Sequence, residues 1–194
     1  MAKITSTVAL LVVLLKHQRE ELTMRAVAKI AKKDYKNVYL GLKELQRAGV
    51  ITVQDIGRAN KVVLNRRAHP LLIAAEYERR AETVKNKSIA VMAEDFARMR
   101  SKLYVMVLFG SHAKGTSTTH SDIDLCFIIP EHSTLETEIR SIEKSLPLNL
   151  HVHVFSEREF TAMARSKEQT VVSEMLDNHV VLYNAEGYYA LTHD

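Results

Sequence analysis

Residues 104–125 read YVMVLFGSHAKGTSTTHSDIDL, a stretch that joins two apolar runs through a polar loop. The first run, Tyr104–Phe109, is continuous and rich in β-forming residues, which predicts a buried strand. Asp122 and Asp124 stand two residues apart where the second run begins, so on a strand both carboxylates leave the same face, about 7 Å apart. Two such carboxylates can hold a hard divalent ion, Mg²⁺ or Mn²⁺. The stretch therefore predicts a strand–loop–strand unit that carries a metal-binding acidic pair.

The turn after the first strand has the chemistry of a phosphate site. Gly110 lets the backbone approach a ligand closely, because it has no side chain. Ser111 offers a hydroxyl and main-chain N–H groups where a strand passes into a helix, a common place for phosphate binding. Lys114 adds a mobile positive charge a few residues later. A phosphate cradle beside a carboxylate pair predicts metal-assisted phosphoryl or nucleotidyl transfer.

Ten residues separate Gly110-Ser111 from Asp122-Ile123-Asp124. With this spacing, residues 101–156 resemble the minimal nucleotidyltransferases of the DNA polymerase β superfamily, whose signature is Gly-Ser, about ten residues, then Asp-x-Asp. The resemblance implies that the Asp pair binds one or two Mg²⁺ ions, and that Gly110, Ser111 and Lys114 hold the triphosphate of an NTP. A nucleoside monophosphate would then pass to an acceptor hydroxyl, with release of pyrophosphate.

The family normally carries a third carboxylate on a later strand, and this chain departs from that pattern. The corresponding run, residues 148–155, contains no Asp or Glu; His151 fills the expected position and His153 follows on the same face. An imidazole can bind a metal or accept a proton, so His151 is the predicted catalytic base. It adds no negative charge, which weakens the binding of a second Mg²⁺ and favours softer ions such as Mn²⁺ or Zn²⁺. Alternatively, both histidines are ordinary polar residues of a partly exposed strand.

The first 68 residues predict three helices followed by a two-stranded hairpin. Thr23 and Asp34 are residues of the type that caps a helix N-terminus, and Gly49 is the type that ends one. The predicted helices span residues 4–17, a short segment after Thr23 and residues 35–48, and the predicted strands span residues 50–56 and 61–64. This order resembles a winged helix-turn-helix domain, in which the third helix enters the major groove of DNA.

Charge supports a nucleic-acid partner for this segment. Residues 1–68 hold 14 Lys/Arg and 5 Asp/Glu, a balance of +9, whereas residues 69–194 have a balance of −5. The resemblance places the DNA contacts on the third helix and its start and on the wing: Lys33, Tyr35, Lys36, Asn37, Lys43, Arg58 and Lys61. A homodimer is expected, because winged helices usually read paired half-sites of double-stranded DNA. Winged helices also serve as protein–protein or dimerisation modules, which is the alternative.

The predicted fold class is α+β, with three parts. A winged helix-turn-helix domain spans residues 1–68, a helical connector spans residues 69–100, and a polymerase β-like domain with a mixed sheet flanked by helices spans residues 101–194. The connector is expected to break near residues 85–88, with Ser88 capping its second helix. The longest apolar run, Val8–Leu15, is far too short to cross a bilayer, so we expect a cytoplasmic protein. The single cysteine, Cys126, excludes an intramolecular disulfide and is expected in the core.

Together these patterns predict a metal-dependent nucleotidyltransferase that moves a nucleotide from an NTP to a macromolecule and is coupled to DNA binding. A protein acceptor is expected, as in the minimal nucleotidyltransferase antitoxins that adenylylate a partner toxin and that residues 101–156 resemble. The competing hypothesis is a weakly active or non-enzymatic transcriptional regulator whose degenerate pocket senses nucleotide. A third, an interaction scaffold, would bind neither nucleotide nor metal.

Overall fold

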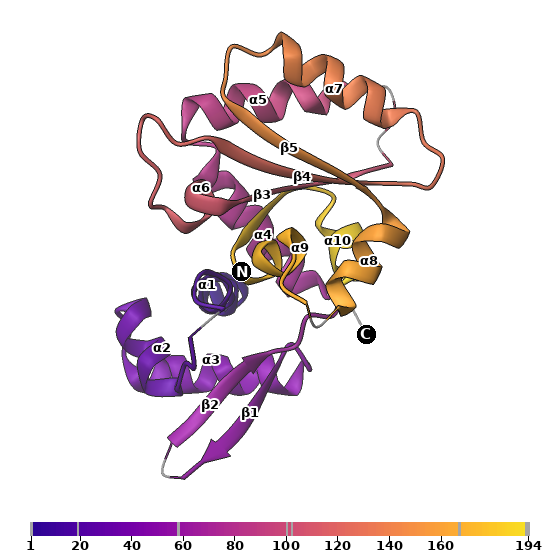
Figure 1. Cartoon of the computed structure of the whole chain (residues 1–194). Helices are drawn as coiled ribbons and strands as arrows, with labels where there is room; N and C mark the ends of the chain where they lie inside the picture. The colour runs from indigo at the N-terminus through magenta and orange to yellow at the C-terminus, as the bar shows by residue number, and fades with distance from the viewer. Residues whose placement is uncertain are drawn as a thin grey trace. The chain divides into compact units, whose positions relative to one another are not determined.

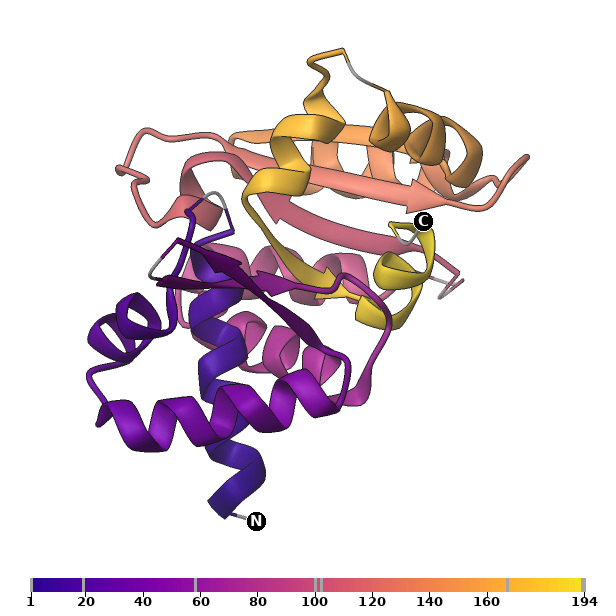
Figure 2. The same ribbon diagram turned by 90° about the horizontal axis from the view of Figure 1, so that it is seen from below.

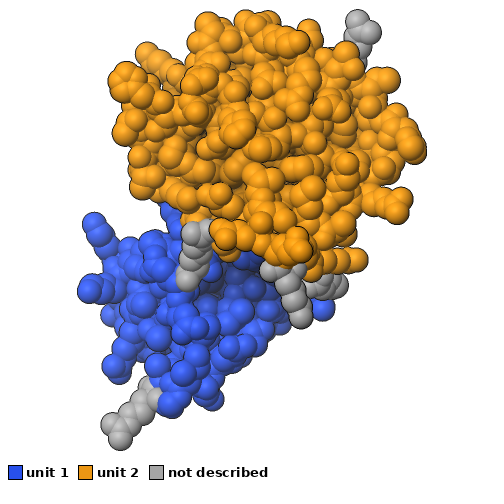
Figure 3. Space-filling view, viewed as in Figure 1, with its two compact units in different colours: residues 1–78, 193–194 blue, residues 79–192 orange. Residues whose placement is uncertain are grey.

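The computed structural model describes residues 2–18, 20–57, 59–99, 101, 103–166 and 168–192. They form two compact units, one within residues 2–78 and one within residues 79–192 (Figure 3). The division falls inside helix α4 (Pro70–Thr83), whereas the domain limits expected at residues 68 and 100 stay a prediction. None of the helices in the described ranges offers an apolar stretch long enough to span a bilayer.

Unit 1 contains the three predicted helices and the predicted hairpin. Thr23 and Asp34 cap α2 and α3 as expected, since each side chain accepts a hydrogen bond from the backbone N–H three residues later. The elements are α1 (Ala2–Lys16), α2 (Met24–Ala31), α3 (Tyr35–Arg47), β1 (Ile51–Ile56) and β2 (Ala59–Leu64). β2 therefore begins two residues earlier than predicted, and Arg58, a predicted DNA contact in the turn, lies outside the described residues.

The core of unit 1 forms where α1 crosses α3 (Figure 2). The helices approach closely at Gly41, where a Cβ atom would lie only 2.8 Å from Leu10 Cδ1. β1 and β2 pair antiparallel, and the Val62 N–H donates to the Leu22 carbonyl, so the segment before α2 lies beside the hairpin. The buried side chains of this core include Leu10, Leu11, Val27, Val38, Leu42, Leu45, Ile51 and Val62.

Unit 2 is built on a four-stranded mixed sheet, which confirms the predicted architecture for this part of the chain. The strand order is β5-β4-β3-β6; β3 pairs antiparallel with β4 and β6, and β4 pairs parallel with β5. The strands are β3 (Val105–Phe109), β4 (Ile123–Ile129), β5 (Leu150–Ser156) and β6 (His179–Tyr183), and the helices are α5 (Lys87–Ala97), α6 (Gly110–Lys114), α7 (Leu135–Ser145), α8 (Glu157–Arg165), α9 (Val171–Asp177) and α10 (Ala185–Leu191).

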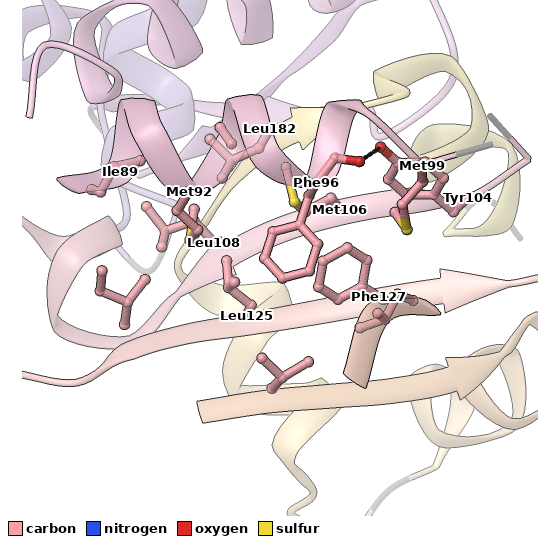
Figure 4. Packing of buried hydrophobic residues seen from close by; sticks show 14 of the residues in the cluster. Ile89, Met92, Phe96, Met99, Tyr104, Met106, Leu108, Leu125, Phe127 and Leu182 are labelled. Carbon is pink, nitrogen blue, oxygen red and sulfur yellow. Dashed lines mark hydrogen bonds between the residues drawn. The ribbon is translucent and has the colours of Figure 1, made fainter. Parts of the chain in front are cut away.

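Helices α5 and α7 cover one face of this sheet, and α8, α9 and α10 lie on the other side (Figure 1). On the first face, the rings of Phe96 and Phe127 lie 4.8 Å apart, and the Tyr104 hydroxyl donates to the Phe96 carbonyl at 3.0 Å (Figure 4). Ile123, Leu125 and Phe127 of β4 all point into this cluster. The alternate residues of β4, which include Asp124, therefore face the opposite side.

The cap of α5 differs from the expected one. Asn86, not Ser88, is the N-cap: its side-chain oxygen accepts hydrogen bonds from the backbone N–H groups of Ser88 and Ile89. Both residue types cap helices well, and the helix begins two residues earlier than expected, at Lys87. The break between α4 and α5 lies within residues 84–86, close to the predicted position.

This cap gives a matched test. We expect Asn86→Ala to lower the free energy of unfolding by about 1 kcal/mol, because two N–H groups of α5 lose their acceptor. Ser88→Ala should change it by less than about 0.5 kcal/mol. Urea unfolding followed by circular dichroism measures both. A larger loss for Ser88→Ala than for Asn86→Ala would contradict the observed cap.

Candidate functional site

Strand pairing brings the Gly-Ser turn against the acidic pair. Phe109, the last residue of β3, lies opposite Asp124 in the antiparallel ladder, so Gly110 follows directly beside this carboxylate. Gly110 has φ +66°, and a Cβ atom there would lie 2.0 Å from Asp124 Oδ2 and 3.3 Å from Asp124 Cβ. Only glycine fits this position, because it tolerates positive φ and leaves room for the carboxylate.

Asp122 and Asp124 lie on either side of Ile123, which is buried in the core cluster. Alternation along the strand therefore directs both carboxylates away from the core. Asp122 is exposed just before β4 begins, and the side chain of Asp124 is 24% exposed. The acidic pair is accessible at the same end of the sheet as the Gly-Ser turn.

The parallel neighbour β5 supplies the other side of the site. Asp124 pairs with His151 in the ladder, and His151 Nδ1 lies 3.4 Å from Asp124 Oδ1. One step earlier, the Asn149 side-chain amide donates a hydrogen bond to Asp122 Oδ1. No role was predicted for Asn149 from the sequence. The period-two alternation of residues 149, 151 and 153 was the signal that could have indicated one.

His153 lies deeper on the same face, among rings. Its ring centroid is 4.6 Å from that of His151, 5.8 Å from that of Phe109 and 6.2 Å from that of Phe155. Burial lowers the pKa of His153, and His151 lowers it further, while Asp124 acts in the opposite direction. His153 is therefore favoured in its uncharged form.

Lys114, the predicted triphosphate-binding cation, pairs with an acid of another helix. Its Nζ lies 3.4 Å from Glu174 Oε1 of α9. Ser111 is half-buried in the first turn of α6, directly after Gly110. To bind a phosphate, Lys114 has to exchange an exposed carboxylate for the ligand, and an exposed ion pair of this kind costs little to break.

The donor set fits a metal ion that a phosphate completes. Within the described ranges, no group of three or more His, Cys, Asp and Glu side chains is arranged to hold an ion by itself. Two acids follow β5 in the first turn of α8: Glu157 is exposed on the helix, and Glu159 accepts from the Ser156 N–H in the capping box and is therefore occupied. Two carboxylates remain, Asp122 and Asp124, and Mg²⁺ is usually bound by one or two carboxylates together with substrate phosphates.

Two further features define the surroundings of the site. A hollow of about 830 Å³ lies beside Asn149, lined by polar side chains that include Asn86, His112, Thr118, His120 and Ser121. On β4, Cys126 is buried as expected, and burial raises the pKa of its thiol to about 12. The thiol is therefore not a nucleophile here, since thiolate is the reactive form.

The predicted DNA-contact residues of unit 1 fall into two groups. Lys33, Tyr35, Lys36 and Asn37 are exposed at the start of α3. Lys43 and Lys61 are half-buried and engaged within the protein. Lys43 donates to Gln46 Oε1 and lies over the ring of Tyr39, and Lys61 forms an ion pair with Glu21.

A cationic hollow, defined by Arg25, Lys29, Lys32, Lys33 and Tyr35, lies between α2 and α3 and has a volume of about 390 Å³. Among the residues that the structure describes, no acidic side chain forms an ion pair with these four cations. By contrast, Lys85, Arg98, Lys114 and Arg140 of unit 2 each pair with a carboxylate. Positive charge is therefore left uncompensated at the start of α3.

Comparison with known families agrees with the site. Residues 90–182 match the family model of the nucleotidyltransferase domain. This confirms the resemblance found over residues 101–156 and extends it on both sides, from α5 to β6. The domain suggests transfer of a nucleoside monophosphate, and domains of this kind typically use divalent metals. Residues 5–68 match a second family model, HVO_A0114, whose description states no activity. Searches among curated proteins and among solved structures gave no match.

The contact between Gly110 and Asp124 can be tested against Gly115, the C-cap at the other end of α6. Gly115 also has positive φ, +72°, but a Cβ atom there would meet nothing within 4 Å. We expect Gly115→Ala to cost about 1–2 kcal/mol for the backbone alone. Gly110→Ala should cost about 1 kcal/mol more, because the new methyl group overlaps Asp124. Urea unfolding of the two variants measures the difference. Equal losses in the free energy of unfolding would mean that the Asp124 side chain moves aside without cost, which contradicts the prediction.

Proposed function

We propose that residues 79–192 transfer a nucleoside monophosphate from an NTP to a hydroxyl of a macromolecular, and specifically a protein, acceptor. The observation that carries this proposal is the pairing of Phe109 with Asp124, which joins the Gly-Ser turn to the acidic pair inside a nucleotidyltransferase domain. The polar hollow beside Asn149 supports it, because it offers the acceptor room next to Asp122.

Asp122 and Asp124 would hold Mg²⁺ or Mn²⁺, which supplies neutralisation of the charge that develops on the phosphates. Gly110 permits the triphosphate to approach the backbone, and the Ser111 hydroxyl binds its oxygens. Lys114 moves from Glu174 to the phosphates. These residues orient the α-phosphorus toward the acceptor, which is the main contribution that a protein makes to such a transfer.

His151 is the proposed proton acceptor. Its Nδ1 faces Asp124, which leaves Nε2 of this 64% exposed side chain available to the acceptor. The acceptor oxygen forms a bond to the α-phosphorus as the bond to the leaving pyrophosphate breaks, and the hydroxyl proton passes to Nε2. Orientation of an imidazole base by a carboxylate at the other nitrogen is a common arrangement in acid–base catalysis.

Labelling tests this function directly. Incubation with α-³²P-labelled NTPs, Mg²⁺ or Mn²⁺ and a cell extract should label an acceptor. Asp122→Asn and Asp124→Asn should reduce labelling by about 100-fold or more, because the metal ligands are lost. Glu168→Gln, an exposed acid of the same unit, serves as the control and should label normally. Labelling that survives both Asp substitutions would contradict the proposed site.

We also propose that unit 1 is a winged helix-turn-helix domain that binds double-stranded DNA as a homodimer. The cationic hollow supports this proposal, because phosphates would compensate cations that have no acidic partner within the described ranges. Tyr35 of the hollow and the next two residues of α3, Lys36 and Asn37, are exposed and are placed to reach base edges or the DNA backbone. Protein–protein or dimerisation contact by the same surface is the competing use.

Salt dependence distinguishes phosphate contacts from other binding. Affinity for duplex DNA should fall steeply with salt, and Lys33→Gln and Lys36→Gln should each reduce the slope of log K against log salt by about 1. Lys144→Gln, an exposed lysine of α7, is the control and should leave the slope unchanged. Absence of binding to any duplex at low salt would remove this proposal.

A second candidate function follows from β5. If His151, which pairs with Asp124, stands where the family has its third carboxylate, the pocket has less negative charge for metal-dependent catalysis, and the protein would then be a DNA-binding regulator that senses nucleotide. In that case no acceptor is labelled, but nucleotide changes the affinity for DNA. The labelling and DNA-binding measurements together separate the two functions.

A further inference from the structure

The ladder between β4 and β5 pairs residues that are 27 positions apart, and the same offset continues just before the two strands, so each carboxylate of the acidic pair has its own neighbour on or directly before β5. Asp124 lies beside His151 in the ladder, and Asp122 is joined to Asn149 by a side-chain hydrogen bond. Both neighbours carry N–H groups and neither carries a carboxylate. β5 therefore offers hydrogen-bond donors where a third acid would otherwise stand.

These contacts engage one oxygen of each carboxylate. The Asn149 amide donates to Oδ1 of Asp122, and His151 Nδ1 lies nearest to Oδ1 of Asp124. The second oxygen of Asp124, Oδ2, faces the backbone of Gly110, where the triphosphate is proposed to lie. In the same way, Asn149 engages Oδ1 of Asp122, and Oδ2 has no hydrogen-bond partner among the described residues.

The backbone keeps Asn149 in place for this contact. The Ile123 N–H donates to the Asn149 carbonyl at 2.9 Å, which ties the residue before β5 to the residue between the two acids. Asp122 itself is exposed, so without a partner its side chain would exchange among rotamers. A charge-assisted hydrogen bond from a fixed amide restricts that freedom without adding or removing charge.

We propose that Asn149 is a positioning residue that holds the Asp122 carboxylate in the orientation for binding a metal–nucleotide complex. This inference rests on the proposed nucleotidyl transfer site, but it names a residue outside the Gly-Ser and Asp-x-Asp motifs. Outer partners of metal ligands commonly contribute about 10–100-fold to affinity by fixing ligand geometry. Asn149 acts through Asp122 and has no direct role toward the reacting atoms.

Mn²⁺ binding in the presence of a non-hydrolysable NTP analogue, followed by electron paramagnetic resonance, tests the inference without turnover. Asn149→Ala should weaken Mn²⁺ binding about tenfold. Asn178→Ala, which removes an amide at the end of α9, is the matched control and should bind as the wild type does. Thermal unfolding of both variants establishes that the fold is intact.

Nuclear magnetic resonance tests the bond itself. The side-chain amide signal of Asn149, assigned by its loss in Asn149→Ala, should shift in Asp122→Asn and stay in place in Glu168→Gln. If the wild type binds no Mn²⁺–nucleotide complex, the proposed function fails. If the wild type binds it and folded Asn149→Ala binds equally well, the positioning role is wrong while the function stands. If the Asn149 amide signal does not shift in Asp122→Asn, the proposed positioning role is also wrong.

Discussion

The alignment of three neighbouring strands is the constraint on which the site depends. β3 ends opposite Asp124 and β5 places His151 beside the same residue, so a single carboxylate lies between the Gly-Ser turn and the imidazole. A slip of one residue in either ladder would turn Asp122 and Asp124 into the core and expose Ile123. The burial of Ile123, Leu125 and Phe127 against α5 and α7 prevents such a slip. Hydrophobic packing on one face therefore fixes the chemistry of the other.

This site carries less negative charge than one with three acids. Asp122 meets the neutral amide of Asn149, Asp124 meets the imidazole of His151, and Glu159 is taken up by the capping box of α8. Two carboxylates suit an ion whose coordination is completed by phosphates, and an imidazole offers a proton acceptor in place of a further anion. In unit 1 the uncompensated charge is positive, because the cations of the cationic hollow have no acidic partners among the described residues.

Local patterns predicted the elements well and failed where two local signals competed. The caps at Thr23 and Asp34 were each the only strong candidate nearby, and both are present. At α5, Asn86 and Ser88 are both good caps two residues apart, and the sequence favoured the wrong one. The asparagine oxygen accepts from two N–H groups of the first turn, those of Ser88 and Ile89, so the observed cap satisfies two donors at once.

Sequence by itself determined the motifs: the ten-residue spacing, the shared face of Asp122 and Asp124, and the absence of an acid from residues 148–155, since these depend on strand periodicity and composition alone. Tertiary structure decided which side chains meet. It joins Asn149 to Asp122, Glu174 to Lys114 and Glu21 to Lys61, and it brings Gly110 against the side chain of Asp124. Each of these contacts joins residues at least 14 positions apart, so they follow from strand register and helix packing, which no local pattern contains.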